Sequence, residues 1–422
     1  MKVKENGFKE TEIGLIPEDW EVVRLKDVAV YMKAGGTPRR TVKDYWNGDI
    51  PFVKIEDITS SNKYILTTKE YITKKGLENS SAWLVPENSI LLSMYASIGE
   101  VALTKFPVAT NQAILAIIPN TDKVSIDFLY YSLKFHEEKL SSYTVQTTQK
   151  NVNKAITENL LIPLPPLDEQ KKIAKVLDKI QQAIEIQDKI IENTKNLKKS
   201  LMQKLFTEGL YGEEQKETEI GLIPKSWEVV RLGEVAVLNL GRTPDRSIKK
   251  YWENGSIPWV KIQDLNNNII YDTSEKISDI AFKEKFGNKF VPQGTILLSF
   301  KLTIGRVGIL GIDAVHHEGI VSLFLNEDKV NKEFLFFLLQ NMDYNDYIDN
   351  YVKGKTLNKE KLKILPIPLP PLEEQKEIAH ILSTVDKKIE IEQKRKEVLK
   401  RLFKTMLHKL MTGEIRLKEI DL

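Results

Sequence analysis

The sequence predicts a mixed α/β (α+β) protein in which two globules are joined by two long, antiparallel coiled-coil helices. Three observations predict it. The chain contains a repeat of whole-domain length, and each copy holds short apolar runs separated by Gly, Pro and Asn. A proline-rich signature then ends each copy and opens a long amphipathic stretch. We therefore expect a tandem duplication with pseudo-twofold symmetry.

The repeat begins near residue 10. Residues 10–30 and 217–237 are identical at 17 of 21 positions. Further matches join Tyr45-Trp46 to Tyr251-Trp252, Ile50–Ile55 to Ile257–Ile262, and Ile162–Leu167 to Ile367–Leu372. Segments 59–85 and 266–291 hardly align. The two copies are thus expected to share a scaffold while presenting two sites of one kind with different specificities.

The first part of each copy, residues 10–160 and 217–362, contains runs of apolar residues bounded by turn formers. These runs predict buried strands at Ser89–Ser93, Ala113–Ile118, Thr295–Phe300 and Ile320–Leu325. Helices are predicted at Phe128–Leu140 and Phe334–Leu339.

The second part of each copy begins at the prolines, which force an extended entry before a new helix. No Gly or Pro interrupts residues 168–208 or 373–412, where apolar residues recur at three- and four-residue spacing. We expect these helices to pair with each other; the alternative is that each packs on its own domain. The predicted boundaries are a first globule 1–165, a first helix 166–210, a second globule 211–370, a second helix 371–414 and a C-terminal tail 415–422.

The charge balance excludes a simple polycation. Sixty-two Lys+Arg against 59 Asp+Glu leave a net charge of +3, so an anionic partner must be met by local basic clusters. The absence of Cys excludes disulfides, thiolate nucleophiles and Cys-based metal sites. The N-terminal residues Met1–Asn6 lack an apolar segment and no membrane span is visible. A cytoplasmic protein without membrane contact is expected.

Catalytic and cofactor motifs are weak. Gly354-Lys355-Thr356 resembles the end of a phosphate loop, but Asp349 stands where that motif needs its first Gly. Gly305–Gly311 has the wrong spacing for a dinucleotide fingerprint, and His316-His317 lacks a ligand pattern for a metal. The residues favour a binding protein without catalytic residues, cofactor or metal.

Polar clusters recur in both copies and predict contacts with phosphates and base edges. They comprise two Gly-rich loops carrying Arg, matched lysines in the Ile-Pro segments, and polar residues before the prolines. The His pair, which only the second copy has, is a further candidate. The candidate DNA contacts are Gly36, Thr37, Arg39, Arg40, Lys54, Thr148, Gln149, Lys150, Asn151, Arg242, Thr243, Arg246, Lys261, His316, His317, Lys353, Lys355 and Thr356.

The opening Gly-Leu-Ile-Pro-x-x-Trp-Glu-Val and the closing Ile-Pro-Leu-Pro-Pro-Leu-x-Glu-Gln-x-x-Ile-Ala with its long helix occur in both copies. Over nearly the whole chain these motifs resemble the DNA-specificity subunit of type I restriction–modification systems. The resemblance implies two target-recognition domains, each reading half of a bipartite site in double-stranded DNA. It also implies helices that set the spacing between the halves.

The resemblance further implies a subunit without catalytic activity. Its partners would be two modification subunits, which bind S-adenosylmethionine and methylate adenine, and ATP-using restriction subunits in a full complex. Asp245 departs from the pattern, since the first copy has Arg39 there. Two alternatives remain: a non-catalytic scaffold or adaptor that binds protein partners, and a single-chain methyltransferase, which would need an Asn-Pro-Pro-Tyr-like motif that is absent.

Overall fold

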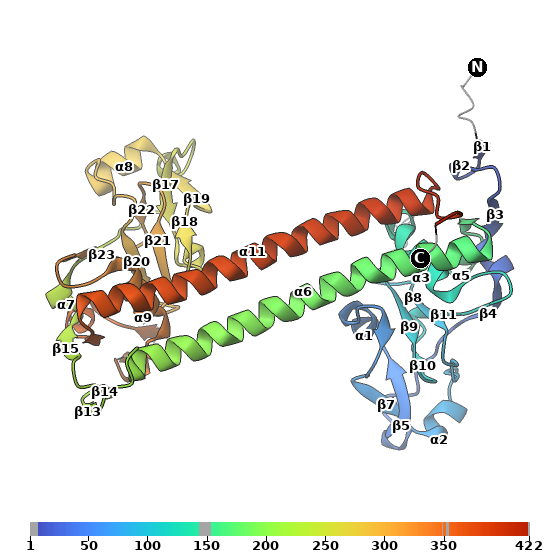
Figure 1. Ribbon diagram of the computed structural model, residues 1–422, viewed down its shortest axis with the longest axis horizontal. Coiled ribbons are helices and arrows are strands. Elements are labelled where there is room, and N and C mark those ends of the chain that lie inside the picture. Colours follow the sequence, from blue (N-terminus) through green and yellow to red (C-terminus); the bar gives the residue numbers. More distant parts are fainter. Residues whose placement is uncertain (1–6, 143–152, 348, 352–353, 421–422) are drawn as a thin grey trace. The chain divides into compact units, whose positions relative to one another are not determined.

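The computed structural model describes residues 7–142, 153–347, 349–351 and 354–420. The chain divides into two compact units. The first comprises residues 1–188 and 395–422, and the second comprises residues 189–394. Each unit therefore contains one globule, part of the helix that follows it, and part of the other long helix (Figure 1).

The first unit is built mainly from short strands and short helices. Its strands are β1 (Phe8–Thr11), β2 (Gly14–Pro17), β3 (Glu21–Arg24), β4 (Ala29–Ala34), β5 (Trp46–Val53), β6 (Tyr64–Ile65), β7 (Glu70–Ile72), β8 (Ile90–Ser93), β9 (Val101–Thr104), β10 (Ala109–Thr110), β11 (Ile114–Pro119) and β12 (Leu161–Leu164). Its helices are η1 (Leu25–Val28), η2 (Lys43–Tyr45), α1 (Ile55–Ser60), α2 (Lys74–Glu78), α3 (Ile126–Phe135), α4 (Glu137–Ser142), α5 (Lys154–Glu158) and the start of α6 (Leu167–Glu208).

The second unit repeats this order. Its strands are β13 (Gln215–Thr218), β14 (Gly221–Pro224), β15 (Glu228–Arg231), β16 (Ala236–Leu240), β17 (Ile257–Val260), β18 (Ile269–Ile270), β19 (Glu275–Ile277), β20 (Ile296–Ser299), β21 (Val307–Leu310), β22 (Val315–His316), β23 (Ile320–Leu325), β24 (Asp349–Tyr351), β25 (Gly354–Thr356) and β26 (Pro366–Leu369). Its helices are α7 (Leu232–Val235), η3 (Lys249–Tyr251), η4 (Ile262–Asp264), α8 (Asp279–Phe286), α9 (Lys332–Asn341), η5 (Asn345–Tyr347), α10 (Lys359–Lys363) and the start of α11 (Leu372–Met411).

The five-stranded and three-stranded sheets have the same topology in both units. A five-stranded sheet has the order β4-β11-β8-β9-β6 in the first unit and β16-β23-β20-β21-β18 in the second. A three-stranded sheet follows with orders β10-β5-β7 and β19-β17-β22, in which β10 and β22 run parallel to β5 and β17. The predicted mixed α/β fold, built twice, is confirmed.

The four strands predicted from apolar runs are confirmed as β8, β11, β20 and β23. The prediction of one helix over Phe128–Leu140 is wrong in detail, because α3 ends at Phe135 and α4 begins at Glu137. His136 caps the break: its backbone N–H donates to the carbonyls of Ser132 and Leu133.

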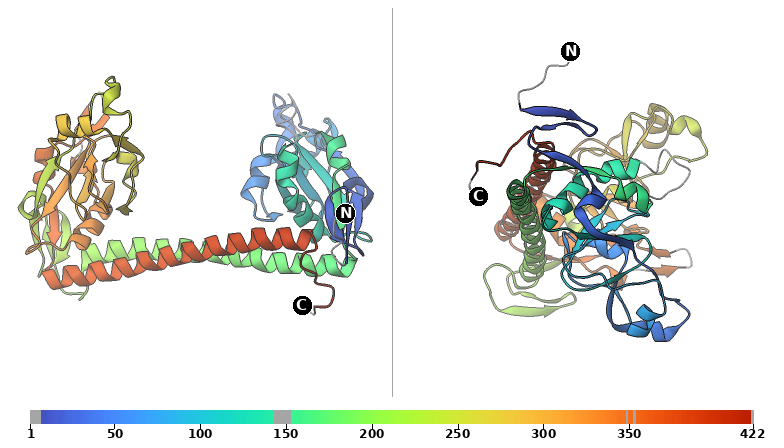
Figure 2. Two further views of the ribbon diagram at one scale, coloured as in Figure 1. Left: turned by 90° about the horizontal axis from the view of Figure 1, so that it is seen from above. Right: turned by 90° about the vertical axis from the view of Figure 1, so that its right-hand side faces the viewer.

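The two long helices pair antiparallel within each unit. In the first unit Asp188 of α6 forms an ion pair with Lys396 of α11, and Glu169 near the start of α6 contacts Arg416 beyond the end of α11. In the second unit Lys198 of α6 pairs with Asp386 of α11 at 2.7 Å. Figure 2 shows the helices side by side in each unit. The sequence alternative, in which each helix packs only on its own domain, is wrong.

Each hydrophobic core takes residues from a globule and from both helices. In the first unit Ile173 and Leu177 of α6 and Leu410 and Met411 of α11 are buried in one core with Phe128. In the second unit the equivalent contributors are Met202, Leu205 and Phe206 of α6 with Ile378 and Leu382 of α11. Burial of such large apolar side chains, worth about 1.5–3 kcal/mol each, fixes the helices on the globules.

The residues of the closing motif fasten each helix to its globule. The Trp20 indole N–H donates to Glu169 Oε2 at 3.1 Å, and the Trp227 indole N–H donates to Glu374 Oε2 at 2.9 Å. Gln170 accepts from the Ser125 backbone N–H at 2.8 Å and donates to the Pro165 carbonyl at 2.8 Å. The Trp-Glu-Val and Pro-Pro-Leu-x-Glu-Gln motifs thus meet in space and have a structural role.

The segment after each long helix also binds the glutamate at the start of the other long helix. Glu374 accepts from the Leu210 backbone N–H at 2.9 Å, while Glu169 accepts from Leu417 N–H at 3.0 Å and from Arg416. Burial alone would raise the pKa of Glu169, but bonds from Arg416, Leu417 and Trp20 outweigh it and lower the pKa. Glu169 is therefore ionised at neutral pH. The C-terminal tail belongs to the first unit.

Candidate nucleic-acid interface

The two Gly-rich loops lie against the edge of the three-stranded sheets. The Gly36 N–H donates to the Thr110 carbonyl at 2.9 Å, and the Arg242 N–H donates to the His316 carbonyl at 2.9 Å. Gly36 is buried, and a Cβ added there would lie 2.1 Å from Ser81 Oγ. Internal packing therefore requires a glycine at this position, and a contact of Gly36 with DNA stays a prediction.

Arg40 and Lys54, predicted separately, come together on one carboxylate in the first unit. The Arg40 guanidinium lies 2.6 Å from Glu70, and the Lys54 ammonium lies 2.8 Å from the same side chain. The Arg40 guanidinium also stacks on the Trp46 ring at 3.9 Å. Stacking and pairing together hold the guanidinium in one orientation.

The second unit repeats this cluster residue by residue. Arg246 lies 2.7 Å from Glu275, Lys261 lies 3.1 Å from Glu275, and Arg246 stacks on Trp252 at 3.8 Å. Burial alone would raise the pKa of Glu275, but hydrogen bonds from Arg246 and Lys261 outweigh it and lower the pKa. In the second unit, two cations and one ionised carboxylate leave the cluster with one net positive charge. In the first unit Lys54 also pairs with Glu56 at 2.5 Å, a second carboxylate where the second unit has Gln263. The arginines remain accessible, with 53% and 54% of the side chain exposed for Arg40 and Arg246.

Sequence reasoning missed Glu70 and Glu275. They occupy equivalent places at the start of β7 and β19, inside segments whose sequences hardly align. The two glutamates are recognised as equivalent only in the structure, because β7 pairs with β5 in the same way as β19 pairs with β17.

The remaining loop residues differ between the repeats. Arg39 is exposed, and no hydrogen bond or ion pair of its guanidinium is found in the described parts of the chain. The equivalent Asp245 accepts from Ser247 N–H and Oγ–H at 2.9 and 2.7 Å, which lowers its pKa and fixes the turn. The departure at Asp245 thus has a local structural reason.

Thr37, Thr243 and Arg242 complete the loops. Thr37 donates to Gln112 Oε1 at 2.6 Å. The buried Thr243 hydroxyl has no hydrogen-bond partner among the described residues. The Arg242 guanidinium donates to the Lys285 carbonyl at 2.8 Å, which leaves part of its donor set available.

The adjacent histidines have different surroundings. His316 is only 2% exposed on β22, and its Nδ1–H donates to the His317 carbonyl at 3.3 Å. Burial lowers the pKa of His316 to about 4. The expectation of a surface or base-contacting role for His316 is therefore wrong, because its ring lies in the interior. His317 is half-buried and lines a hollow at the surface.

Part of the predicted set has no described side chain. Thr148, Gln149, Lys150, Asn151 and Lys353 lie outside the described residues. Lys355 and Thr356 belong to β25, whose backbone pairs antiparallel with β24, Asn350 opposite Lys355. Their contacts with DNA stay predictions.

A hollow of about 370 Å³ lies beside the cluster of the second unit. It is lined by Arg246, Trp259, Lys261, Ile262, Gln263, Leu302, Thr303, Arg306 and His317. The structure thus brings three predicted residues together with Gln263 and Arg306, which sequence reasoning missed.

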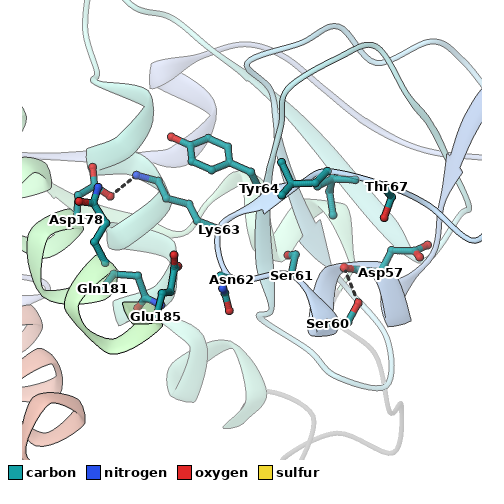
Figure 3. A pocket seen from close by; sticks show the side chains of 13 residues that line it. Asp57, Ser60, Ser61, Asn62, Lys63, Tyr64, Thr67, Asp178, Gln181 and Glu185 are labelled. Carbon is teal, nitrogen blue, oxygen red and sulfur yellow. Dashed lines mark hydrogen bonds and ion pairs between the residues drawn. The ribbon is translucent and has the colours of Figure 1, made fainter. Parts of the chain in front are cut away.

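The first unit has a different polar feature where α6 meets the globule. A cavity of about 450 Å³ is lined by residues 60–67 together with Asp57, Asp178, Gln181, Gln182 and Glu185 (Figure 3). Lys63, 6% exposed, pairs with Asp178 and lies 2.7 Å from Asp127, while the Tyr131 hydroxyl donates to Asp178 at 2.6 Å. Burial alone would lower the pKa of Lys63, but the two carboxylates outweigh it and raise the pKa. This ionic cluster positions α6.

No group of three or more His, Asp or Glu side chains that could hold a metal ion occurs among the described residues. No helix within the described ranges is long and apolar enough to cross a membrane.

The repeated fold and the repeated basic cluster define a two-domain binding protein with one site in each repeat. A family model described as the type I restriction modification DNA specificity domain matches residues 17–196 and again residues 224–401. The chain therefore belongs to this family and contains two of its domains.

Relatives and solved structures agree with this assignment. The MjaVIII specificity subunit of a type I restriction enzyme from Methanocaldococcus jannaschii is 33% identical, covering 99% of this chain and 98% of the relative. The EcoBI specificity subunit from Escherichia coli is 25% identical over 78% of this chain and 71% of the relative. The chain thus has the two-domain organisation of a type I specificity subunit.

The solved structures show a shared fold. A chain from a study of complex assembly and conformational transition of the type I R-M system superposes with a TM-score of 0.65 at 20% identity, covering 95% of this chain and 99% of that chain. The type I restriction–modification S subunit from M. genitalium gives a TM-score of 0.55 at 16% identity, covering 97% and 98%.

Proposed function

We propose that this chain is the sequence-specific DNA-binding subunit of a type I restriction–modification complex, and that each repeat reads one half of a bipartite site in double-stranded DNA. The observation that carries the proposal is the duplicated cluster of Arg, Lys, Glu and Trp, which each unit places beside side chains that differ between the repeats. A shared cluster suits the phosphate backbone, which is the same in every sequence, and different neighbours suit different bases.

The long helices have a second part in the proposed function. They set the distance between the half-sites and dock two modification subunits, with restriction subunits joining in a full complex. The chain itself binds and does not catalyse. S-adenosylmethionine and ATP are bound by the partner subunits, and the complex works in the cytoplasm.

Exchange of one repeat tests the proposal. Residues 10–160 are replaced by the equivalent segment of a relative with a different target, leaving β12 and both long helices unchanged. Methylome sequencing of DNA from cells that hold the complex should then show one altered half-site and one unaltered half-site. The matched exchange of residues 217–362 should alter the other half only. A single exchange that changed both halves would contradict the assignment of one half to each repeat.

A further inference from the structure

The positions that line the hollow beside His317 in the second repeat have equivalents in the first repeat, where different side chains occupy them. Four equivalences follow from the strand registers and the flanking identities of the repeats: Gln263 with Glu56, Leu302 with Ala96, Arg306 with Glu100, and His317 with Asn111. Carboxylates of the first repeat are thus replaced by an amide and a guanidinium in the second.

Arg306 has a fixed backbone and an unused side chain. Its N–H donates to Ser299 Oγ at 2.9 Å, and its carbonyl accepts from the Ser299 N–H at 2.9 Å. Its guanidinium makes no hydrogen bond or ion pair with any residue that the structure describes. The equivalent Glu100, in contrast, is paired with Lys134 at 3.1 Å. A guanidinium with five free donors suits two adjacent acceptors.

His317 also presents a donor to the hollow. Its Nδ1 accepts from the Gly319 backbone N–H at 2.8 Å, so Nδ1 carries no proton. Burial lowers the pKa of His317, which keeps the ring neutral at neutral pH. The single ring proton is therefore on Nε2, which acts as a donor. Packing against Trp259, with ring centroids 5.6 Å apart, fixes the ring.

The turn that carries Leu302 is strained in the same way in both repeats. Leu302 has φ 64° and the equivalent Ala96 has φ 55°, in the left-handed region that non-Gly residues rarely adopt. Ser299 holds the turn, since its hydroxyl donates to the Thr303 carbonyl at 2.5 Å. Leu302 is nevertheless 72% exposed. Such strain persists where the surroundings enforce it, and it concentrates at binding sites.

We propose that Arg306 and His317 are the specificity-determining residues of the second repeat, which read the acceptor edge of a guanine in the major groove. Guanine presents two adjacent acceptors there, O6 and N7, whereas cytosine presents a donor and adenine one of each. Glu56, Glu100 and Asn111 at the equivalent places predict a different base for the first repeat. The inference rests on the proposed function that each repeat reads half a site.

Two substitutions separate base reading from phosphate binding. Arg306→Ala removes the guanidinium, while Arg306→Lys keeps the positive charge but cannot form a bidentate pair of hydrogen bonds. Full-length chain, co-expressed with its modification subunits, is used to select binding sites from randomised duplex DNA. Both variants should lose a preference for guanine at one position of one half-site by about tenfold or more, with the other half-site unchanged. His317→Ala should weaken the preference at the same or the adjacent base pair.

Arg231→Ala is the matched control. It removes one positive charge from the same repeat on β15, where Arg231 is paired with Glu219 outside the hollow. Both half-sites should be retained. If Arg306→Ala instead weakened binding to all sequences equally while Arg306→Lys restored it, Arg306 would be a phosphate contact and the inference overturned. A wild-type half-site without guanine would also overturn it. Selection of no bipartite sequence by the wild type would instead refute the proposed function itself.

Discussion

His316 and His317 are adjacent in sequence, yet only the His317 side chain lines a hollow at the surface. Alternation along β22 directs the His316 ring into the interior, where Gly241 makes room for it: a Cβ at Gly241 would lie 2.3 Å from His316 Nδ1. His317 follows the strand and faces the hollow. The first repeat has Thr110 and Asn111 at these positions. The buried position therefore belongs to packing, and the neighbouring position is the one that we propose for recognition.

Burial of His316 predicts a pH-dependent stability of the second unit. Its pKa is about 4 in the folded protein and near 6.5 when unfolded, so the unfolded chain binds more protons between these values. The stabilisation is complete above pH 6.5 and falls by roughly 3 kcal/mol as the pH drops toward 4. His316→Asn, which retains a donor for the His317 carbonyl, should flatten this dependence in urea unfolding at several pH values. His380→Asn, at an exposed position of α11, should leave the dependence as in the wild type.

At the scale of elements, the sequence predicted what depends on local pattern. The strands β8 and β20, the helices α6 and α11 and the repeat itself follow from periodicity and identity. The Arg40–Glu70 and Arg246–Glu275 pairs could not be predicted, because β7 and β19 lie in divergent segments and reach β5 and β17 only through long-range pairing. The break at His136 was missed for a different reason, since no Gly or Pro marks it in the sequence.

The closing motif also has a structural role that could not be predicted from the sequence. Gln375 accepts from the Asn331 backbone N–H at 2.8 Å and donates to the carbonyls of Pro370 and Lys329 at 2.8 and 3.1 Å. One buried side chain therefore joins the start of α11, the turn before α9 and the proline segment. Polar groups buried in this way are costly when they lose their partners.

Removal of the Gln375 side chain should destabilise the second unit. Gln375→Ala leaves a backbone N–H and two carbonyl oxygens without this partner, and we expect a loss of about 2 kcal/mol or more in the free energy of unfolding. Urea unfolding of the full chain, followed by tryptophan fluorescence, measures it. Gln203→Ala on the exposed face of α6 makes the same chemical change in the same unit and should cost less than about 0.5 kcal/mol. Equal losses from both variants would show that Gln375 has no special role.

At the scale of the whole molecule, each unit is completed by both long helices. Residues 395–422 belong to the first unit although they lie at the far end of the sequence, and α6 ends in the core of the second unit. Both helices therefore change from one unit to the other at defined places, after Asp188 in α6 and after Lys394 in α11. Residues inserted at both places are therefore expected to leave the packing inside each unit intact.

Matched insertions at these places test the proposed spacing role. Three heptads added to each helix lengthen it by about 32 Å, close to one turn of B-DNA, and return the apolar stripe to the same face. The gap between unchanged half-sites should then grow by about nine or ten base pairs in methylome sequencing. A single matched heptad adds only about 10.5 Å, roughly three base pairs. At that separation the second half-site faces another side of the duplex, so methylation should weaken.

Three heptads inserted in α6 alone would shift its pairing with α11, removing partners such as Lys198–Asp386, and should lower stability. An unchanged gap with the matched insertion in a stably folded chain would mean that the helices do not set the spacing.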